Sequence, residues 1–322
     1  MKAAVLKNSG DANAFQLEER PIPQASEDTI LIKVKAFGLN RSELMTRKGY
    51  SPNVKFPRVL GIECVGEVES DPSGDYQKGQ KVAALMGGMG RDFDGSYAEY
   101  TVLPKSIVFP FESQLSWDQL GAIPEMYQTV YGSLSLALNC QKGDNLLIRG
   151  GTSSIGMLAT QLAKSMGVQV IATTRNPDKA SLLMNNGVSY CLIDDGELAS
   201  KVKAIFPDGV DKVLELVGTV TLKDSLHCAK PGGTVCMTGM LAEQWEIPNF
   251  APMDFIPPLV SLTIYNSGAA NIIPAIFQDF IHTVEAGQIH LNVSKVFHLD
   301  EIAKAHAYME SNQAGGKLVV LT

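Results

Sequence analysis

The sequence predicts an α/β protein in which a β-rich domain accompanies a doubly wound parallel sheet. Residues 1–122 contain short apolar runs separated by glycine and proline, as in a barrel or a sandwich. Residues 144–173 have the pattern of a strand, a glycine turn, a helix and a second strand. From there to about residue 265, strand and helix patterns alternate, which predicts a parallel sheet.

The β-rich domain is predicted to consist of short strands and one helix. In residues 29–37 apolar side chains largely alternate with polar ones, which is typical of a half-buried strand. A short helix over residues 41–48 is expected to start after Asn40. The predicted strands cover residues 1–6, at an edge of a sheet, and residues 29–37, 64–68, 81–85, 97–103 and 107–109.

The most informative stretch is the glycine turn that follows the apolar run of residues 146–148. Such a run is typical of a buried parallel strand. Gly150 and Gly151 then allow the backbone to turn sharply. Ser153 and Ser154 stand where a helix begins, and either can cap its first N–H groups. We therefore expect a helix N-terminus at the end of a strand.

A helix N-terminus in this position is suited to a phosphate or pyrophosphate group, because its amides and dipole favour an anion. The spacing Gly150-x-x-Ser153-x-x-Gly156 places serine where a dinucleotide-binding motif often has its middle glycine. The flanking strand, helix and second strand are the context that confirms such a motif. We predict a dinucleotide site; a parallel-sheet turn without a ligand is the alternative.

The remainder of the chain divides into two parts. Asn176 and Pro177 are expected to cap a helix through residue 186. Strands are expected at residues 213–217, 234–238 and 260–265, a helix at 221–229 and a turn at 231–233. The alternation stops after about residue 267. A helix over 272–286, a strand over 296–299, a helix capped by Asp300 and a strand over 317–321 are expected to return to the first domain. The predicted domains are thus 1–122 with 268–322, and 123–267.

Composition excludes several classes of function. The formal net charge of −7 provides no basic footprint for nucleic acid or an anionic membrane. The first residues lack the apolar core of a signal peptide, and no apolar run approaches the ~20 residues that span a bilayer. Five scattered cysteines suit a reducing compartment. We predict a cytoplasmic protein without nucleic-acid or membrane partners.

Several motifs together resemble the zinc-free quinone oxidoreductase (zeta-crystallin-like) branch of the medium-chain dehydrogenases/reductases. They are NRSE at 40–43, GIECVG at 61–66, GSYAEY at 95–100, QLAKSMGVQVIAT at 161–173, GVDKVLELVG at 209–218, KPGGTV at 230–235 and GGKLVV at 315–320. The resemblance runs over nearly the whole chain. It implies a GroES-like β-barrel domain and a Rossmann domain, with the active site in the cleft between them.

The resemblance also implies where the cofactor and the substrate are bound. The nicotinamide is expected near Asn40, Thr129, Val217 and Met240. Hydride transfer leaves negative charge on the acceptor oxygen, and a preorganised donor stabilises that charge. The candidate donors are the Asn40 amide, the Tyr50 phenol and a nicotinamide ribose hydroxyl. Alternatively, Tyr50 is an exposed aromatic residue of a turn and not a donor. The candidate cofactor-binding residues are Thr129, Gly150, Gly151, Thr152, Ser153, Ser154, Ile155, Gly156, Thr174, Arg175, Lys179, Val217, Gly239, Met240 and Lys317.

The zinc ligands of related dehydrogenases have no counterparts here. Those relatives have a cysteine in the segment matching 40–43, a histidine before the glutamate of the G-x-E motif, and a four-cysteine lobe. In this chain 40–43 contains no cysteine, Ile62 precedes Glu63, and residues 71–95 contain no cysteine. Zinc needs three or four converging ligands. We therefore predict no metal site, and interpret Glu63 as a structural carboxylate.

Cofactor choice is predicted from the end of the second strand of the parallel sheet. An NAD-specific site places Asp or Glu there to accept the ribose hydroxyls. This chain has Thr174, Arg175 and then Lys179, which suit the 2′-phosphate of NADPH. Alternatively, Arg175 and Lys179 belong to a charged surface that faces solvent and binds no phosphate. Relatives often have a tyrosine after the next strand, where this chain has Asp194.

Together these residues predict an NADPH-dependent, zinc-independent reductase of quinones or α,β-unsaturated carbonyls. One alternative is an enoyl-thioester reductase with Tyr50 as proton donor. An alternative of another class is a non-catalytic NADPH-binding sensor or structural protein. Relatives pair their Rossmann domains through the last strand, and the apolar run at 260–265 is a plausible edge, so we also predict a homodimer.

Overall fold

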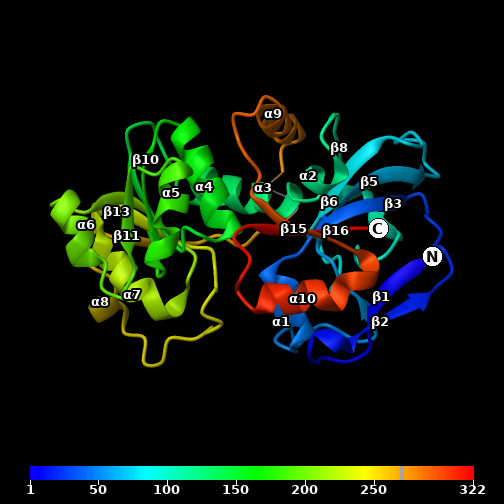
Figure 1. The fold of residues 1–322 in the computed structure, drawn as a ribbon, viewed down its shortest axis with the longest axis horizontal. Helices are drawn as coiled ribbons and strands as arrows, with labels where there is room; N and C mark the ends of the chain where they lie inside the picture. Colours follow the sequence, from blue (N-terminus) through cyan, green and yellow to red (C-terminus); the bar gives the residue numbers. More distant parts are fainter. Residues whose placement is uncertain (269–271) are drawn as a thin grey trace. The chain divides into compact units, whose positions relative to one another are not determined.

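The computed structural model describes residues 1–268 and 272–322. It divides into two compact units (Figure 1). The first unit comprises Met1–Gln128 and Ser267–Thr322, and the second comprises Thr129–Asn266. The chain therefore leaves the first unit once and returns to it.

The first unit contains two sheets whose apolar faces share one core. β1 lies between β2 and β4 in a three-stranded antiparallel sheet. A seven-stranded sheet has the order β15-β16-β3-β5-β6-β8, with β7 also paired to β3. The strands are β1 Lys2–Leu6, β2 Phe15–Glu19, β3 Thr29–Gly38, β4 Arg58–Val59, β5 Glu63–Ser70, β6 Lys81–Leu85, β7 Tyr100–Pro104, β8 Val108–Pro110, β15 Val293–His298 and β16 Lys317–Leu321.

The last strand ties the end of the chain to its beginning. β16 pairs antiparallel with β3, so Val320 stands opposite Phe37. In Figure 1 this red C-terminal strand lies beside the blue strand β3. The core that results contains side chains from β1, β3, β5 and β16, all nearly inaccessible to solvent. The helices of the unit are α1 Arg41–Arg47, α2 Trp117–Leu120, α9 Pro274–Glu285 and α10 Ile302–Glu310, with 3₁₀ turns η1 Ala12–Ala14, η2 Lys105–Ile107 and η6 Leu299–Glu301.

The second unit is a six-stranded parallel sheet in the order β11-β10-β9-β12-β13-β14. The order reverses between β9 and β12, which is the doubly wound arrangement whose ligands bind outside the carboxyl ends of the strands. The strands are β9 Asn145–Arg149, β10 Gln169–Thr174, β11 Tyr190–Ile193, β12 Val210–Glu215, β13 Ala229–Met237 and β14 Ser261–Ile264. The apolar runs of the central strands β9, β10 and β12 are largely buried, as expected for strands covered on both faces, whereas the outer strands β11 and β14 are partly exposed.

Helices connect the parallel strands of this unit. α6 and α7 pack together over an apolar cluster that includes Leu147, Val213 and Leu226. α3 Pro124–Tyr131 begins in the first unit and enters the second, where π-helix η3 Gly132–Ala137 continues it. The remaining helices are α4 Ser154–Ser165, η4 Pro177–Lys179, α5 Ala180–Asn185, α6 Ala199–Ile205, α7 Thr219–Cys228 and α8 Pro252–Phe255.

Three local predictions were wrong. The strand at the N-terminus is not an edge strand, because it is paired on both sides. The predicted turn at 231–233 falls within β13, where a register shift against β12 accommodates the extra residues. Asp300 does not cap its helix; it lies inside η6, which His298 precedes. The predicted edge at residues 260–265 was correct, because among the described strands β14 pairs only with β13. No helix among the described residues is long and apolar enough to cross a membrane.

Candidate active site and cofactor site

The glycine turn connects β9 to α4 at the carboxyl edge of the parallel sheet. Gly150 has φ of +88°, a conformation that an L residue rarely adopts. A Cβ at Gly151 would lie 2.8 Å from the Cβ of Ala172, and one at Gly156 would lie 2.6 Å from the carbonyl oxygen of Gly150. The absence of side chains is therefore what lets the turn, the neighbouring strand and the helix approach closely. The sequence predicted the sharp turn at Gly150 and Gly151.

Ser153 is the N-cap of α4. Its Oγ accepts a hydrogen bond from the Gly156 amide at 3.0 Å and donates one to the Gly150 carbonyl at 2.8 Å. The first N–H groups of a helix have no partner inside it. The N–H groups of Ser154 and Ile155 therefore have no partner inside the helix, and they lie at the end that carries the positive pole of the helix dipole. This arrangement fits the pyrophosphate of a dinucleotide.

The end of β10 carries two cationic side chains. Arg175 is exposed and Lys179 is half-buried, and neither side chain has a hydrogen bond or ion pair with another described residue. Thr174 is buried, and its hydroxyl is already engaged, donating to the Asn176 carbonyl and accepting from the Asn176 amide. Arg175 and Lys179 are thus available to an anion, whereas the Thr174 hydroxyl holds the turn.

The segments after β12 and β13 lie side by side. The buried carboxylate of Glu215 accepts the amides of Val217 at 2.6 Å and Gly218 at 3.0 Å. Its backbone carbonyl accepts the amide of Gly239 at 3.1 Å. A Cβ at Gly239 would lie 2.3 Å from the carbonyl oxygen of Leu216, so glycine is required for this approach. Val217, Gly239 and Met240 consequently lie at one edge of the sheet, each partly exposed.

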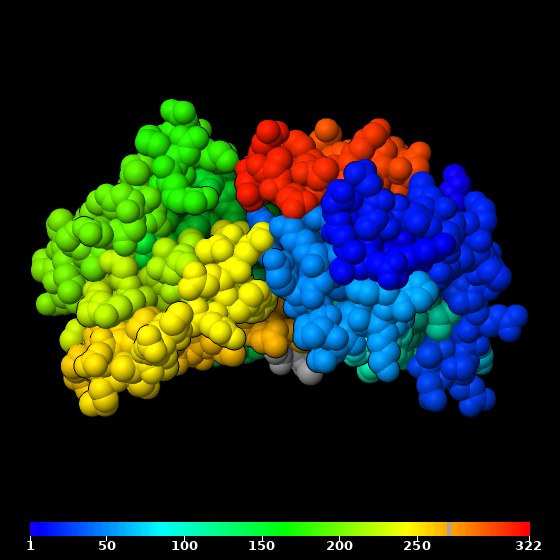
Figure 2. Space-filling view, turned by 90° about the horizontal axis from the view of Figure 1, so that it is seen from below, coloured from blue at the N-terminus to red at the C-terminus, as the bar shows by residue number. Residues whose placement is uncertain are grey.

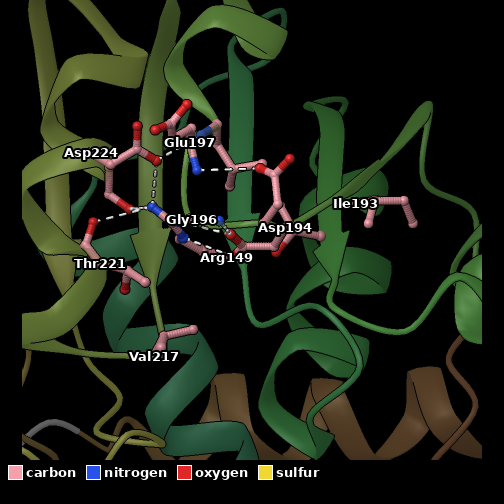
Figure 3. Close-up of polar contacts among 12 residues, drawn as sticks. Arg149, Ile193, Asp194, Gly196, Glu197, Val217, Thr221 and Asp224 are labelled. Carbon is pink, nitrogen blue, oxygen red and sulfur yellow. Dashed lines mark hydrogen bonds and ion pairs between the residues drawn. The ribbon is translucent and has the colours of Figure 1, made fainter.

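A buried arginine network, which the sequence did not indicate, lies behind this edge (Figure 3). The fully buried Arg149 side chain forms a two-point pair with Asp194, from Nε and Nη2, each at 2.8 Å. Its Nη1 donates to Asp224 at 2.7 Å, to Ser225 Oγ at 3.1 Å and to the Thr221 carbonyl at 3.1 Å. These partners are 45 to 76 residues distant in sequence, so no local pattern reveals them.

In the first unit, Asn40 begins α1. Its backbone amide donates to Glu43 Oε2 at 2.8 Å, and the two residues form a reciprocal capping box. The other oxygen of Glu43, Oε1, accepts the amide of Ile62 at 3.1 Å. The buried Glu43 carboxyl therefore joins the start of α1 to the segment that leads into β5.

The side-chain amide of Asn40 is oriented by two buried charged groups. Lys317 Nζ donates to Asn40 Oδ1 at 2.6 Å, and Asn40 Nδ2 donates to Glu63 Oε1 at 2.8 Å. An ammonium can only donate and a carboxylate can only accept, so these partners permit one orientation of the amide. The Asn40 carbonyl oxygen is thus held by the Lys317 side chain and not by a backbone group.

Lys317 and Glu63 also form an ion pair at 2.7 Å, with side-chain exposures of 2% and 0%. The second oxygen of Glu63 accepts the Glu125 amide at 2.8 Å at the start of α3. Burial, and then the charge of Glu63, raise the pKa of Glu43 to about 7. Lys317 was among the predicted cofactor-binding residues, and the structure buries its ammonium between Asn40 and Glu63.

The two remaining candidates differ in exposure. Tyr50 follows α1 in a turn, where its amide donates to the Met45 carbonyl at 2.9 Å, and its side chain is 60% exposed. Thr129 lies in α3 and is buried, and its carbonyl accepts the Ser133 hydroxyl at 2.7 Å. Within the part of the chain that the structure describes, no three His, Cys, Asp or Glu side chains are grouped to hold a metal.

The doubly wound sheet, its glycine turn and the accompanying β-rich unit define a class of protein, the two-unit oxidoreductases that bind a dinucleotide. Two family models match the sequence: the alcohol dehydrogenase GroES-like domain over residues 26–113, and the zinc-binding dehydrogenase domain over residues 154–286. Together they cover most of both units.

Individual relatives are similar over the full length. A quinone oxidoreductase of Lama guanicoe is 24% identical, with 100% of this chain and 97% of that protein covered. An acryloyl-coenzyme A reductase of Metallosphaera sedula is also 24% identical, with 100% of each covered. The structure of Escherichia coli quinone oxidoreductase complexed with NADPH has a TM-score of 0.89 at 21% identity, covering 100% of each chain. The chain belongs to the medium-chain dehydrogenase/reductase superfamily, in its zinc-free quinone oxidoreductase branch, and is an oxidoreductase.

Proposed function

We propose that the protein is an NADPH-dependent reductase of quinones or α,β-unsaturated carbonyls that acts by direct hydride transfer without zinc. The observation that carries this proposal is a capped helix N-terminus at the glycine turn, together with two cations after β10 that have no partner among the described residues. The helix N-terminus suits a pyrophosphate, and the two cations suit a 2′-phosphate. The E. coli quinone oxidoreductase, whose structure contains bound NADPH, supports this choice of cofactor.

The residues of the second unit bind and orient the cofactor in this proposal. The amides of Ser154 and Ile155 bind the pyrophosphate, and Arg175 and Lys179 bind the 2′-phosphate. The close packing that Gly151, Gly156 and Gly239 permit allows backbone to approach the cofactor. When bound, NADPH supplies the hydride.

The residues of the first unit stabilise the oxygen that becomes negative. One N–H of the Asn40 amide is bound to Glu63, whereas the other has only long contacts, at 3.5 Å, with the Gly38 carbonyl and Glu43. We propose that this second N–H positions the nicotinamide ribose or the acceptor oxygen. The exposed Tyr50 hydroxyl stabilises or protonates the reduced oxygen.

An enoyl-thioester reductase is a second candidate, because the acryloyl-coenzyme A reductase relative acts on a conjugated thioester by its name. A panel of quinones, enals, enones and enoyl thioesters, assayed by NADPH oxidation in a chelator, separates the possibilities. Faster turnover of quinones and enones supports the proposal, and selective turnover of thioesters supports the second candidate. Tight NADPH binding without oxidation of any acceptor would show a binding protein instead.

We also propose a homodimer that forms through β14. This strand ends the parallel sheet; Leu259, shortly before it, is 79% exposed, and Ile264, its last residue, is 64% exposed. Unpaired strand edges favour pairing with another chain. The segment before β14 is on the surface of the second unit (Figure 2, yellow and orange), where Met253 is 94% exposed. Light scattering is expected to give about twice the chain mass of 34.7 kDa; the monomer mass at micromolar concentration would contradict the dimer.

A further inference from the structure

The Arg149 network contains a carboxylate beside the proposed phosphate site. Asp194 directly follows β11, and its amide donates to the Thr174 carbonyl at 2.9 Å. In the parallel pairing Thr174 stands opposite Ile193, so Asp194 is next to the strand end that leads into Arg175. Neighbouring strands are about 4.8 Å apart. A negative charge at this place would oppose a 2′-phosphate and favour ribose hydroxyls.

The Asp194 carboxylate is nevertheless withdrawn and paired. Its side chain is only 7% exposed, and both oxygens are bound by Arg149 at 2.8 Å. Oδ1 also accepts the Gly196 amide at 3.0 Å (Figure 3). A planar guanidinium matches a carboxylate at two points, which fixes its direction as well as its charge.

A second carboxylate completes the network on the side of α7. Asp224 binds Arg149 Nη1 at 2.7 Å and accepts the amides of Leu198 at 2.9 Å and Ala199 at 3.2 Å. Arg149 is thereby fixed whether or not Asp194 is charged. Asp224 supplies a matched control, because it binds the same guanidinium but belongs to α7 and not to the strand end beside Arg175.

We infer that Arg149 is a specificity-positioning residue, which neutralises Asp194 and holds its carboxylate away from the 2′-phosphate of NADPH. The inference rests on the proposed use of NADPH. In this account Arg175 and Lys179 attract the phosphate, and Arg149 neutralises the adjacent carboxylate that would repel it. If Arg149 served only to hold the loop after β11 in place, its replacement would affect the binding of NADPH and NADH equally.

The test is a cycle of variants in which NADPH and NADH dissociation constants are measured by fluorescence titration. Arg149→Met is expected to release the carboxylate and weaken NADPH binding about five- to tenfold at low salt, with NADH unchanged or tighter. Asp194→Asn in that background should restore NADPH affinity, whereas Asp224→Asn should not. In the presence of the native arginine, Asp194→Asn should change the NADPH-to-NADH ratio less than about twofold.

Arg149→Lys is measured alongside, because a buried carboxylate without its partner can prevent folding. One ammonium cannot reproduce the two-point pair with Asp194 and also bind Asp224, so a smaller shift in the same direction is expected. Equal losses for both cofactors, or no rescue by Asp194→Asn, would overturn the inference. The wild-type protein tests the proposed function separately: if it binds NADH as tightly as NADPH, the cofactor proposal itself is wrong.

Discussion

Replacing Lys317 by Met is expected to destabilise the protein strongly and to disorder the Asn40 amide. The ammonium lies 2.7 Å from Glu63 Oε1 and 2.6 Å from Asn40 Oδ1, and both charged side chains are almost fully buried. Removing one member of such a pair leaves an uncompensated buried charge, which costs about 3–5 kcal/mol of unfolding free energy. The exposed pair of Lys304 and Glu301 is a matched control, because Lys304→Met should cost less than about 1 kcal/mol.

The double variant Lys317→Met/Glu63→Gln separates charge from packing. It removes the orphaned charge while a glutamine oxygen can still accept the Glu125 amide, so it should be more stable than Lys317→Met alone. Without Lys317 the Asn40 carbonyl has lost its donor, and kcat/KM should fall about tenfold in both variants, consistent with a lost charged hydrogen bond. Urea unfolding and steady-state kinetics measure the two effects. A loss below about 1 kcal/mol in Lys317→Met, or a double variant no more stable than the single one, would refute the reasoning.

Three further predictions concern single residues. Arg175→Ala should weaken NADPH binding about tenfold and leave NADH nearly unchanged; equal losses in a titration would show that Arg175 does not contact the phosphate. Tyr50→Phe should lower kcat and kcat/KM together, and more for enones than for quinones; wild-type rates with both acceptors would make Tyr50 a turn residue. Burial, and then the charge of Arg47, lower the pKa of His306 to about 3 from its ordinary 6.5. The unfolded chain therefore binds this proton first as pH falls, so between about pH 7.5 and pH 5 the native protein should lose about 2 kcal/mol of stability relative to His306→Gln. Glu43 titrates in both proteins and cancels in this difference. Urea unfolding measures it, and an identical pH dependence in both proteins would contradict the assignment.

The sequence was informative wherever local chemistry determines structure. The glycines of the turn and the Ser153 cap follow from steric freedom and unsatisfied amides, which act within a few residues. The last strand of the parallel sheet, β14, was predicted to be an edge strand from its apolar, β-branched run, and its position at the end of the sheet confirms this. Such patterns were enough to predict the fold class and the helix N-terminus proposed to bind the cofactor.

The partners of the buried charged side chains could not be predicted from the sequence in this way. Lys317 is 254 residues from Glu63, and only the return of β16 onto β3 brings them together. Arg149 directly follows the apolar run of residues 146–148, and its carboxylate partners come from separate βα segments. Asp194 was noted only as a replacement for a tyrosine, since its pairing depends on the order of strands in the sheet. Buried charges are positioned by tertiary structure, so one-dimensional patterns do not identify their partners.

The central claim is hydride transfer from NADPH to a conjugated acceptor without zinc. Metal-depleted enzyme, with zinc content verified by elemental analysis, is incubated with NADPH deuterated at the nicotinamide C4 position and an enone. Mass spectrometry of the product is expected to show one deuterium on the β-carbon, at a turnover rate equal to that of untreated protein. A product without deuterium, or activity that returns only when stoichiometric zinc is added, would contradict the account.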